Sequence, residues 1–586
     1  MNIAAVTGGT VVTPGRRVRA DVHIRDGKVV AIGDHPAADG PQLDATGCYV
    51  LPGGVDPHCH LMAGAGPATA AAARGGTTTV LSFTSPAAGE RDLAALLRNR
   101  AELDRDGAAV DVGLHVAIYD PDHLTPDDLV AAKRAGAAAI KIFLAYPELG
   151  IMCSTRRLYE LMSAAAQAGL LVQVHCENAP LIDALTAAAL RAGAGPAGTG
   201  RSGARIFADT RPPEVEEEAV ARTLAVASLT GAACYLVHLS TAGALDQVRL
   251  ARQRRAPRIF AEVCTHHLLF DDSRYAGADA ERYLVAPPLR ARPHVEALWA
   301  GLADGTIDTI GSDHCQVRSM TVGSLADAGH RYRYGLAGVG PRLPALLSAA
   351  AARGLPIERV MQLAAENPAR AFGHYPAKGA LAPGSDADVV VFDPSGGSVL
   401  PENGFGDGTG ASVYAGLAVR GQVRDVLLRG QPIVHAGAIV NQQHGRYLPV
   451  LARGSTPSPR GQPPGPHGPE TPRGRGGPGR QAGKSSHAAR CVTECTLISL
   501  KSGNCGRCST RWRQQLSKQA PRFRPGTLTP SWTWSAAGWS SASSRCSWSP
   551  SLSSWPRRSC RATPRTPSSA GRPTRSGCTR PSGNCT

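Results

Sequence analysis

The hydrophobic and polar positions of this chain follow different patterns along its length. Near the start, "RADVHIRDGKVVAIG" (19–33) alternates apolar and polar residues on both sides of Asp26-Gly27, which is typical of a β-hairpin. Similar text returns late, in "DADVVVFDP" (386–394) and "VRDVLLRGQPIVHAG" (423–437). The chain therefore carries two β-rich stretches that lie far apart in the sequence.

The long middle of the chain alternates short apolar runs with Ala-rich helical stretches. One helix is expected over 154–168, with Ser154 as its N-cap and Gly169 as its end. Eight strand and helix units over about 330 residues indicate a closed parallel (β/α)8 barrel of the TIM type. The expected strands are "CYVLPGGVD", "TTTVLSF", "VDVGLHVAI", "AAIKIFL", "LLVQVH", "CYLVHLS", "IFAEVC" and "IDTIGSD".

We therefore expect an α/β protein with a barrel over residues 49–377. Residues 1–48 and 378–450 would pair as a small β-sandwich domain that is discontinuous in sequence. Residues 455–586 differ, because they are rich in Pro, Gly, Arg and Ser and show no core-forming period. We expect this segment to be a disordered basic tail or a frame-shifted read-through.

The formal net charge of +17 would usually suggest nucleic acid or an anionic membrane as a partner. However, residues 455–586 hold 21 Lys and Arg and two acids, which leaves 42 bases and 44 acids in the first 454 residues. The alternatives for the tail are a nucleic-acid arm with stacking Trp residues and a zinc cluster at Cys491, Cys495, Cys505 and Cys508. The near-absence of acids and of a core-forming pattern favours read-through over both.

Cysteine and hydropathy indicate the compartment. The seven cysteines of residues 1–454 lie in apolar runs, as expected of buried thiols rather than of a disulfide framework. The N-terminus lacks the cationic start of a signal peptide, and no uncharged apolar run reaches the roughly 18 residues that span a bilayer. We expect a cytoplasmic protein that requires neither a membrane nor nucleic acid.

Metal-competent side chains stand at the ends of five of the expected strands. A single strand histidine is more often a core residue than a ligand. Since the chemistry of such a barrel lies at the C-terminal ends of its strands, six of these groups would meet at one level. This convergence indicates a metal centre. The groups are His58, His60, Lys141, His175, His238 and Asp313.

Lys141 is the unusual member, because an ammonium in an apolar strand facing four histidines is costly to bury and repels a metal. The conflict disappears if its amine has reacted with CO₂, since the carbamate is an anion with two oxygens that can bridge two metals. The neighbouring Cys59, Cys176 and Cys315 are expected to point away from the site, because adjacent strand residues face opposite sides.

Several motifs together resemble the dihydropyrimidinase/hydantoinase branch of the amidohydrolase superfamily. The resemblance runs over roughly residues 1–450 and ends before the tail. Its longest element, "ENPARAFGHYPAKGALAPGSDADVVVFDP", is specific by itself. The others are "GGVDPHCH", "IKIFLAY", "VQVHCEN", "TRPPEVEEEAVAR", "VHLS", "PPLR" and "GSDHC".

The resemblance implies two Zn²⁺ ions bridged by N6-carboxylated Lys141, with His58, His60 and Asp313 on one ion and His175 and His238 on the other. It implies a metal-bridging hydroxide as nucleophile, Asp313 as the group that moves the proton, and Tyr146 as the hydroxyl that stabilises the oxyanion. The implied reaction is hydrolysis of the ring amide of dihydropyrimidines or 5-substituted hydantoins. A homotetramer or homodimer is implied as well.

Three departures from the family pattern affect substrate specificity. Only 14 residues separate His60 from "GGTTT", which shortens a segment that gates the exocyclic group in the family. Ala286 replaces the usual serine, and Tyr334 replaces the usual asparagine before Gly335. The resemblance implies that both positions contact the substrate ring mainly through backbone groups, so those contacts can survive substitution.

Two alternative functions are compatible with most of the same motifs. An allantoinase-like or dihydroorotase-like enzyme would need the same metal ligands. A non-catalytic dihydropyrimidinase-related scaffold would keep the fold but lose ligands, and here all six ligands are present. Metal analysis separates the two classes, because a scaffold should purify with much less than one zinc per chain.

The first prediction concerns the tail. A chain truncated after residue 454 should keep its zinc content, melting behaviour and turnover, because every candidate site residue lies before residue 335. It should also be more soluble, since the removed segment carries the excess positive charge. Metal analysis, thermal melts and activity assays on both chains check this. Loss of activity or of the oligomer on truncation would identify the tail as a functional module.

Overall fold

The computed structural model describes residues 2–34, 39–61, 64–87, 89–192, 203–254, 257–315, 320–322, 331–409 and 412–450. For residues 320–322 and 331–333 only the backbone is considered. The expectations for residues 455–586, including the four-cysteine alternative, lie outside the described residues.

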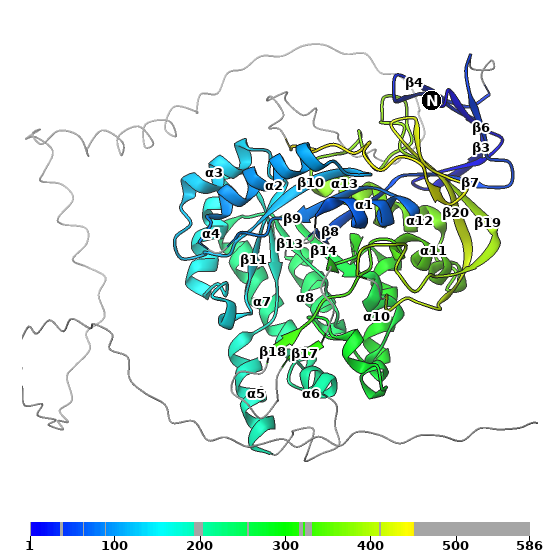
Figure 1. Cartoon of the computed structure of the whole chain (residues 1–586). Helices are drawn as coiled ribbons and strands as arrows, with labels where there is room; N and C mark the ends of the chain where they lie inside the picture. Colours follow the sequence, from blue (N-terminus) through cyan, green and yellow to red (C-terminus); the bar gives the residue numbers. More distant parts are fainter. Residues whose placement is uncertain are drawn as a thin grey trace, which may run out of the picture. The chain divides into compact units, whose positions relative to one another are not determined.

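Eight strand positions form a closed parallel barrel, which confirms the predicted fold class (Figure 1). Every neighbouring pair is parallel. The last position is shared by two short strands, of which β15 pairs with β14 and β16 pairs with β8, and so the ring closes. The strands are β8 (Gly54–His60), β9 (Thr77–Phe83), β10 (Asp111–Ala117), β11 (Ala139–Phe143), β12 (Leu171–His175), β13 (Cys234–Leu236), β14 (Ile259–Cys264), β15 (Thr309–Gly311) and β16 (His314–Cys315).

Helices connect successive barrel strands and surround them (Figure 1). The helix α4 (Thr155–Ala168) begins where Ser154 accepts a hydrogen bond from the Arg157 amide and ends at Gly169 in the left-handed conformation, as predicted. Within the described part of the chain, no helix is both long and apolar enough to cross a bilayer. The remaining α-helices are α1 (Ala65–Arg74), α2 (Asp92–Asp106), α3 (Pro126–Arg134), α5 (Ala179–Arg191), α6 (Gly203–Asp209), α7 (Pro213–Thr230), α8 (Ala242–Gln253), α9 (Thr265–Leu269), α10 (Arg292–Asp304), α11 (Arg342–Ala352), α12 (Ile357–Met361) and α13 (Asn367–Ala371).

The two β-rich stretches combine into a second domain. A four-stranded sheet in the order β5-β4-β1-β6 and a seven-stranded sheet in the order β22-β21-β20-β19-β7-β2-β3 share one apolar core. The predicted turn at Asp26-Gly27 has positive φ at both residues and joins β4 to β5. The strands are β1 (Ala5–Thr7), β2 (Thr10–Thr13), β3 (Arg16–Arg19), β4 (Val22–Arg25), β5 (Lys28–Ile32), β6 (Gln42–Asp44), β7 (Tyr49–Pro52), β19 (Val389–Val399), β20 (Ala418–Leu428), β21 (Gln431–His435) and β22 (Ala438–Ile439).

The segment 48–56 was expected as one barrel strand, and this is wrong. Its first part is β7, which pairs with β19 and β2 of the second domain, and its second part is β8 of the barrel. The change of sheet falls at Gly53, where a Cβ atom would lie 2.0 Å from the Thr78 hydroxyl oxygen. Only glycine allows this approach, so the Gly-Gly pair marks a change of sheet.

A buried ion cluster joins the barrel to the second domain. The Lys378 Nζ atom lies 2.5 Å from Asp111 Oδ2, 2.8 Å from Asp386 Oδ2 and 2.9 Å from Asp388 Oδ2. Asp111 begins β10, whereas Asp386 and Asp388 precede β19. Burial lowers the pKa of Lys378, but the three carboxylates outweigh it and raise the pKa above its ordinary value. This ammonium neutralises carboxylates that would otherwise repel one another.

We expect Lys378→Met to lower the free energy of unfolding by about 3–5 kcal/mol, because it removes the cation of the buried Asp388 carboxylate, whereas Asp111 and Asp386 keep Arg429 and Lys28. Urea unfolding followed by circular dichroism measures this. Lys133→Met, on the partly exposed face of α3, is the matched control and should change stability by no more than about 0.5 kcal/mol. Equal effects of the two substitutions would contradict the role of the cluster.

Candidate active site and metal centre

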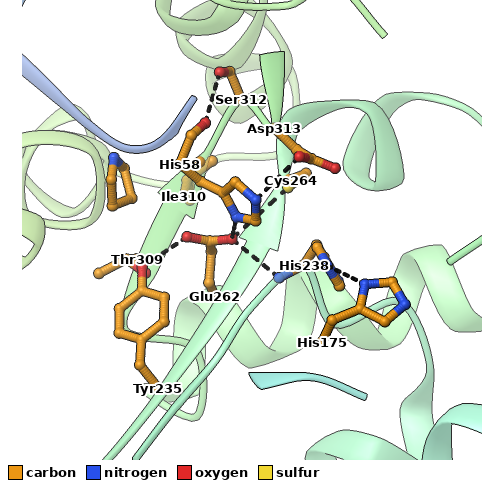
Figure 2. Close-up of polar contacts among 12 residues, drawn as sticks. His58, His175, Tyr235, His238, Glu262, Cys264, Thr309, Ile310, Ser312 and Asp313 are labelled. Carbon is orange, nitrogen blue, oxygen red and sulfur yellow. Dashed lines mark hydrogen bonds and ion pairs between the residues drawn. The ribbon is translucent and has the colours of Figure 1, made fainter. Parts of the chain in front are cut away.

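The first group of candidate ligands lies at the ends of β8 and β15. The Asp313 Oδ1 atom is 3.0 Å from His58 Nε2 and 3.4 Å from His60 Nε2. One ligand atom from each residue lies within 4.8 Å of the others. Figure 2 shows the His58 ring directed at the Asp313 carboxylate. Two imidazole nitrogens and one carboxylate oxygen facing a common point suit a divalent transition metal.

The second group consists of the two histidines at the ends of β12 and β13. His175 Nδ1 and His238 Nε2 are 3.0 Å apart (Figure 2). Burial lowers the pKa of both side chains, so both imidazoles are neutral and suited to bind a metal. The ring centroids of His58 and His238 are 5.4 Å apart, which brings the two groups side by side.

Lys141 lines the same cavity as these five ligands. Its side chain is 1% exposed, and its Nζ atom stands 4.7 Å from the ring centroid of Phe83 and 5.4 Å from that of Phe143. Burial is the largest influence on its pKa, which falls to about 8. Roughly a tenth of this lysine is therefore a neutral amine at pH 7, far more than for a lysine of ordinary pKa, and the neutral amine is the form that reacts with CO₂.

Two buried glutamates that the sequence analysis missed fix the orientation of the ligand histidines. His58 Nδ1 donates to Glu262 Oε1 at 2.7 Å, and His175 Nε2 donates to Glu177 Oε2 at 2.8 Å. Because an ionised carboxylate only accepts hydrogen bonds, each contact keeps that ring nitrogen protonated and leaves the other nitrogen free to bind a metal. An acid inside the apolar strand "IFAEVC" was the signal for Glu262.

The electrostatics around His58 favour a cation. Burial lowers the pKa of His58, but the charges of Glu262 and Asp313 outweigh burial and raise it to about 9. Burial also raises the pKa of the Asp313 carboxyl, yet His58 and His60 hold it well below its ordinary value. The two carboxylates thus attract positive charge to His58, and so to its Nε2 atom, which Glu262 leaves free. A metal ion competes with a proton for this nitrogen. The residues present fit a metal site.

Three residues of the site have left-handed backbone conformations. The φ angles are 70° at Tyr146, 40° at His238 and 47° at Asp313. Such conformations are unfavourable for residues with a Cβ atom and occur most often at functional sites. They turn each side chain out of the strand direction and into the cavity.

The Tyr146 hydroxyl is close to the metal-competent groups. Its oxygen lies 3.1 Å from His175 Nε2. Burial raises the pKa of Tyr146 well above its ordinary value, so the phenol stays protonated and can donate a hydrogen bond.

The cavity that these residues line has a volume of about 470 Å³. Ala286 and Tyr334 lie on its wall, together with aromatic and aliphatic side chains. Of the neighbouring cysteines, Cys59 and Cys176 belong to the apolar core, as expected. Cys315 also lines the cavity, so the expectation that it points away from the site was wrong. Cys315 lies two residues after Asp313, and residues two apart on a strand face the same side.

Comparisons with known proteins agree with this geometry. A D-hydantoinase of Ralstonia pickettii is 32% identical over 464 residues, covering 76% of this chain and 98% of that protein. A D-phenylhydantoinase of Escherichia coli O9:H4 (strain HS) is 34% identical over 470 residues, covering 76% of this chain and 97% of that protein. The solved dihydropyrimidinase of Brevibacillus agri NCHU1002 matches with a TM-score of 0.69 at 31% identity, covering 78% of this chain and 100% of that chain.

A sequence profile described as "Amidohydrolase family" matches residues 49–433. The chain belongs to the amidohydrolase family. Its relatives assign it to the dihydropyrimidinase and hydantoinase branch, as its motifs predicted, and it is a hydrolase of that type.

The role of Glu262 leads to a testable expectation. Glu262→Gln should weaken metal binding about 10–100-fold, because the neutral amide no longer supports the protonated His58 nitrogen as strongly. Metal retained per chain during a chelator titration measures this. Glu160→Gln, at a partly exposed position of α4, is the matched control and should retain metal like the unsubstituted protein. Equal retention by both variants would exclude Glu262 as a support for the metal ligand.

Proposed function

We propose that this protein is a zinc-dependent cyclic amidase that opens the ring amide or imide bond of dihydropyrimidines or 5-substituted hydantoins. The observation that carries the proposal is that four histidines, one aspartate and one buried lysine line a single cavity. Relatives named D-hydantoinase and dihydropyrimidinase support the substrate class.

In this proposal His58, His60 and Asp313 would hold one ion, His175 and His238 would hold the other, and carboxylated Lys141 would serve both as a shared anionic ligand. The supporting observations are the free ring nitrogens and the lowered pKa of Lys141. When bound, such a metal pair lowers the pKa of a water and polarises the substrate carbonyl.

Asp313 moves the proton of the reaction. Its lowered pKa keeps the carboxylate ionised, and the ionised form is the one that can accept a proton from the attacking water. The same oxygen then returns the proton to the amide nitrogen that leaves, so the ring opens without a net change at Asp313. Its left-handed backbone conformation directs this carboxylate toward the histidines.

Tyr146 stabilises the negative charge that forms on the carbonyl oxygen. A protonated phenol in a buried cavity is a strong donor toward an oxyanion, because little water competes with it. The backbone groups of Ala286 and Tyr334 hold the ring of the substrate, and the apolar wall receives its exocyclic group.

We further propose a cytoplasmic homotetramer or homodimer that acts on a small cyclic amide and requires neither nucleic acid nor a membrane. The near-neutral charge of residues 1–454 supports this. So do the cysteines of the described residues, none of which forms a disulfide.

Purified full-length protein should open dihydrouracil or hydantoin, lose this activity on chelation and regain it with Zn²⁺. Ring opening is followed by ultraviolet absorbance and product analysis, with allantoin and dihydroorotate in the same panel. Turnover of only these last two would favour the allantoinase-like or dihydroorotase-like alternative. Absence of metal-dependent ring opening across the panel, with less than one zinc per chain, would favour the scaffold.

Lys141→Ala should lose metal and activity together, and a short carboxylic acid with bicarbonate should restore part of both. Lys141→Arg should not be tolerated, because a guanidinium stays cationic and cannot form the carbamate. Lys133→Ala is the matched control. A metal-loaded and active Lys141→Arg protein would contradict the bridging role.

A further inference from the structure

Cys264, His266 and His267 form a compact cluster at the end of barrel strand β14. One potential ligand atom of each residue lies within 4.8 Å of the others. The strand ends at Cys264, and the chain then turns directly into helix α9, which carries both histidines. The centroids of the two imidazole rings are 4.3 Å apart. This turn from strand to helix brings one sulfur and two imidazoles together.

The cluster lies outside the cavity of the candidate active site. None of these three described side chains is among the residues that line that cavity, and each is at most 2% exposed. Cys264 Sγ lies 4.0 Å from Oε1 of Glu262, the carboxylate that supports His58 (Figure 2). The cluster is therefore a neighbour of the metal centre described above and not a part of it.

The ring nitrogens of the two histidines are poorly satisfied. Within the described part of the chain, neither nitrogen of His266 has a hydrogen-bond partner, although the ring is fully buried. His267 Nε2 lies 3.0 Å from the Pro287 carbonyl oxygen, which only accepts, so Nε2 carries the proton and Nδ1 keeps its lone pair. His267 Nδ1 has no partner among the described residues either. Buried polar atoms in this state are costly unless something binds them.

The protonation states of the cluster suit a metal ion. Burial lowers the pKa of both imidazoles, so each ring is neutral and keeps one lone pair. Burial raises the pKa of the Cys264 thiol well above its ordinary value, so the thiol holds its proton until a metal ion replaces it. One thiolate and two imidazoles suit a borderline-soft ion, and Zn²⁺ is commonly bound by Cys and His.

We propose that Cys264, His266 and His267 bind a further Zn²⁺ ion, separate from the metal pair of the proposed active site. The ion displaces the Cys264 proton, which leaves to solvent, and no electron is transferred. Because the three side chains are closed off from solvent, the ion is taken up as the chain folds and does not exchange in the folded protein. It ties the end of β14 to α9 and so supports the strand that carries Glu262.

The first test uses the unsubstituted full-length protein. Dialysis against a chelator should remove ions from the open cavity but leave one Zn²⁺ per chain, which should be released only when urea unfolds the protein in the presence of the chelator. Metal analysis before and after unfolding measures both steps. Folded protein that is free of zinc after chelation would overturn the inference.

The same experiment separates this inference from the proposed function, because total zinc counts both sites. One retained Zn²⁺ per chain, with no zinc lost during chelation, would support the buried site while the proposed metal pair failed. Zinc and activity lost together, with no Zn²⁺ retained, would support the metal pair and overturn the buried site.

A second test identifies the ligands. Protein produced with Co²⁺ in place of Zn²⁺ should keep a thiolate-to-Co²⁺ charge-transfer band in the near ultraviolet after chelation, because no ligand proposed for the metal pair contains sulfur. Cys264→Ser should lose this band and the retained ion. Cys315→Ser is the matched control, since its thiol lines the active-site cavity, and it should keep both. Absence of the band from the unsubstituted protein, or its survival in Cys264→Ser, would overturn the inference.

Discussion

The site depends on one buried carboxylate. Glu262 accepts hydrogen bonds from His58 Nδ1, from the His238 backbone amide at 3.0 Å and from the Tyr235 hydroxyl at 2.8 Å. A carboxylate in the barrel interior is stable only with its oxygens fully hydrogen-bonded. The hydrogen bonds that Glu262 requires therefore fix His58 and His238, which come from different strands, in one arrangement. Figure 2 shows these contacts meeting at the two carboxylate oxygens of Glu262.

Much of the fold could be predicted because its patterns are local. The α4 caps and the Asp26-Gly27 turn depend on residues close in sequence. The division of 48–56 between two sheets could not be predicted, since it depends on the distant Thr78. The run Val389–Phe392 also lacks alternation, because its residues pack alternately against the sandwich core and against the main core that includes the barrel. Periodicity alone cannot identify the partner on either face.

That the six candidate ligands line one cavity could be predicted, because strand ends in a parallel barrel meet at one level. The roles of Glu177 and Glu262 could not, since a glutamate beside a histidine in sequence or buried in a strand has many possible partners. The contact of Tyr334 with Tyr146, whose ring centroids are 5.9 Å apart, also required coordinates. These residues are 188 positions apart in the sequence, and only the closed barrel brings their rings together.

The left-handed backbone at Tyr146, His238 and Asp313 has a consequence for any engineering of this enzyme. Each such residue costs of order 1–3 kcal/mol of folding free energy relative to an unstrained conformation. Glycine at these positions would relieve the strain while deleting a side chain of the site. A library ranked by heat tolerance alone would therefore enrich catalytically impaired proteins at these three positions, so selection there has to include turnover.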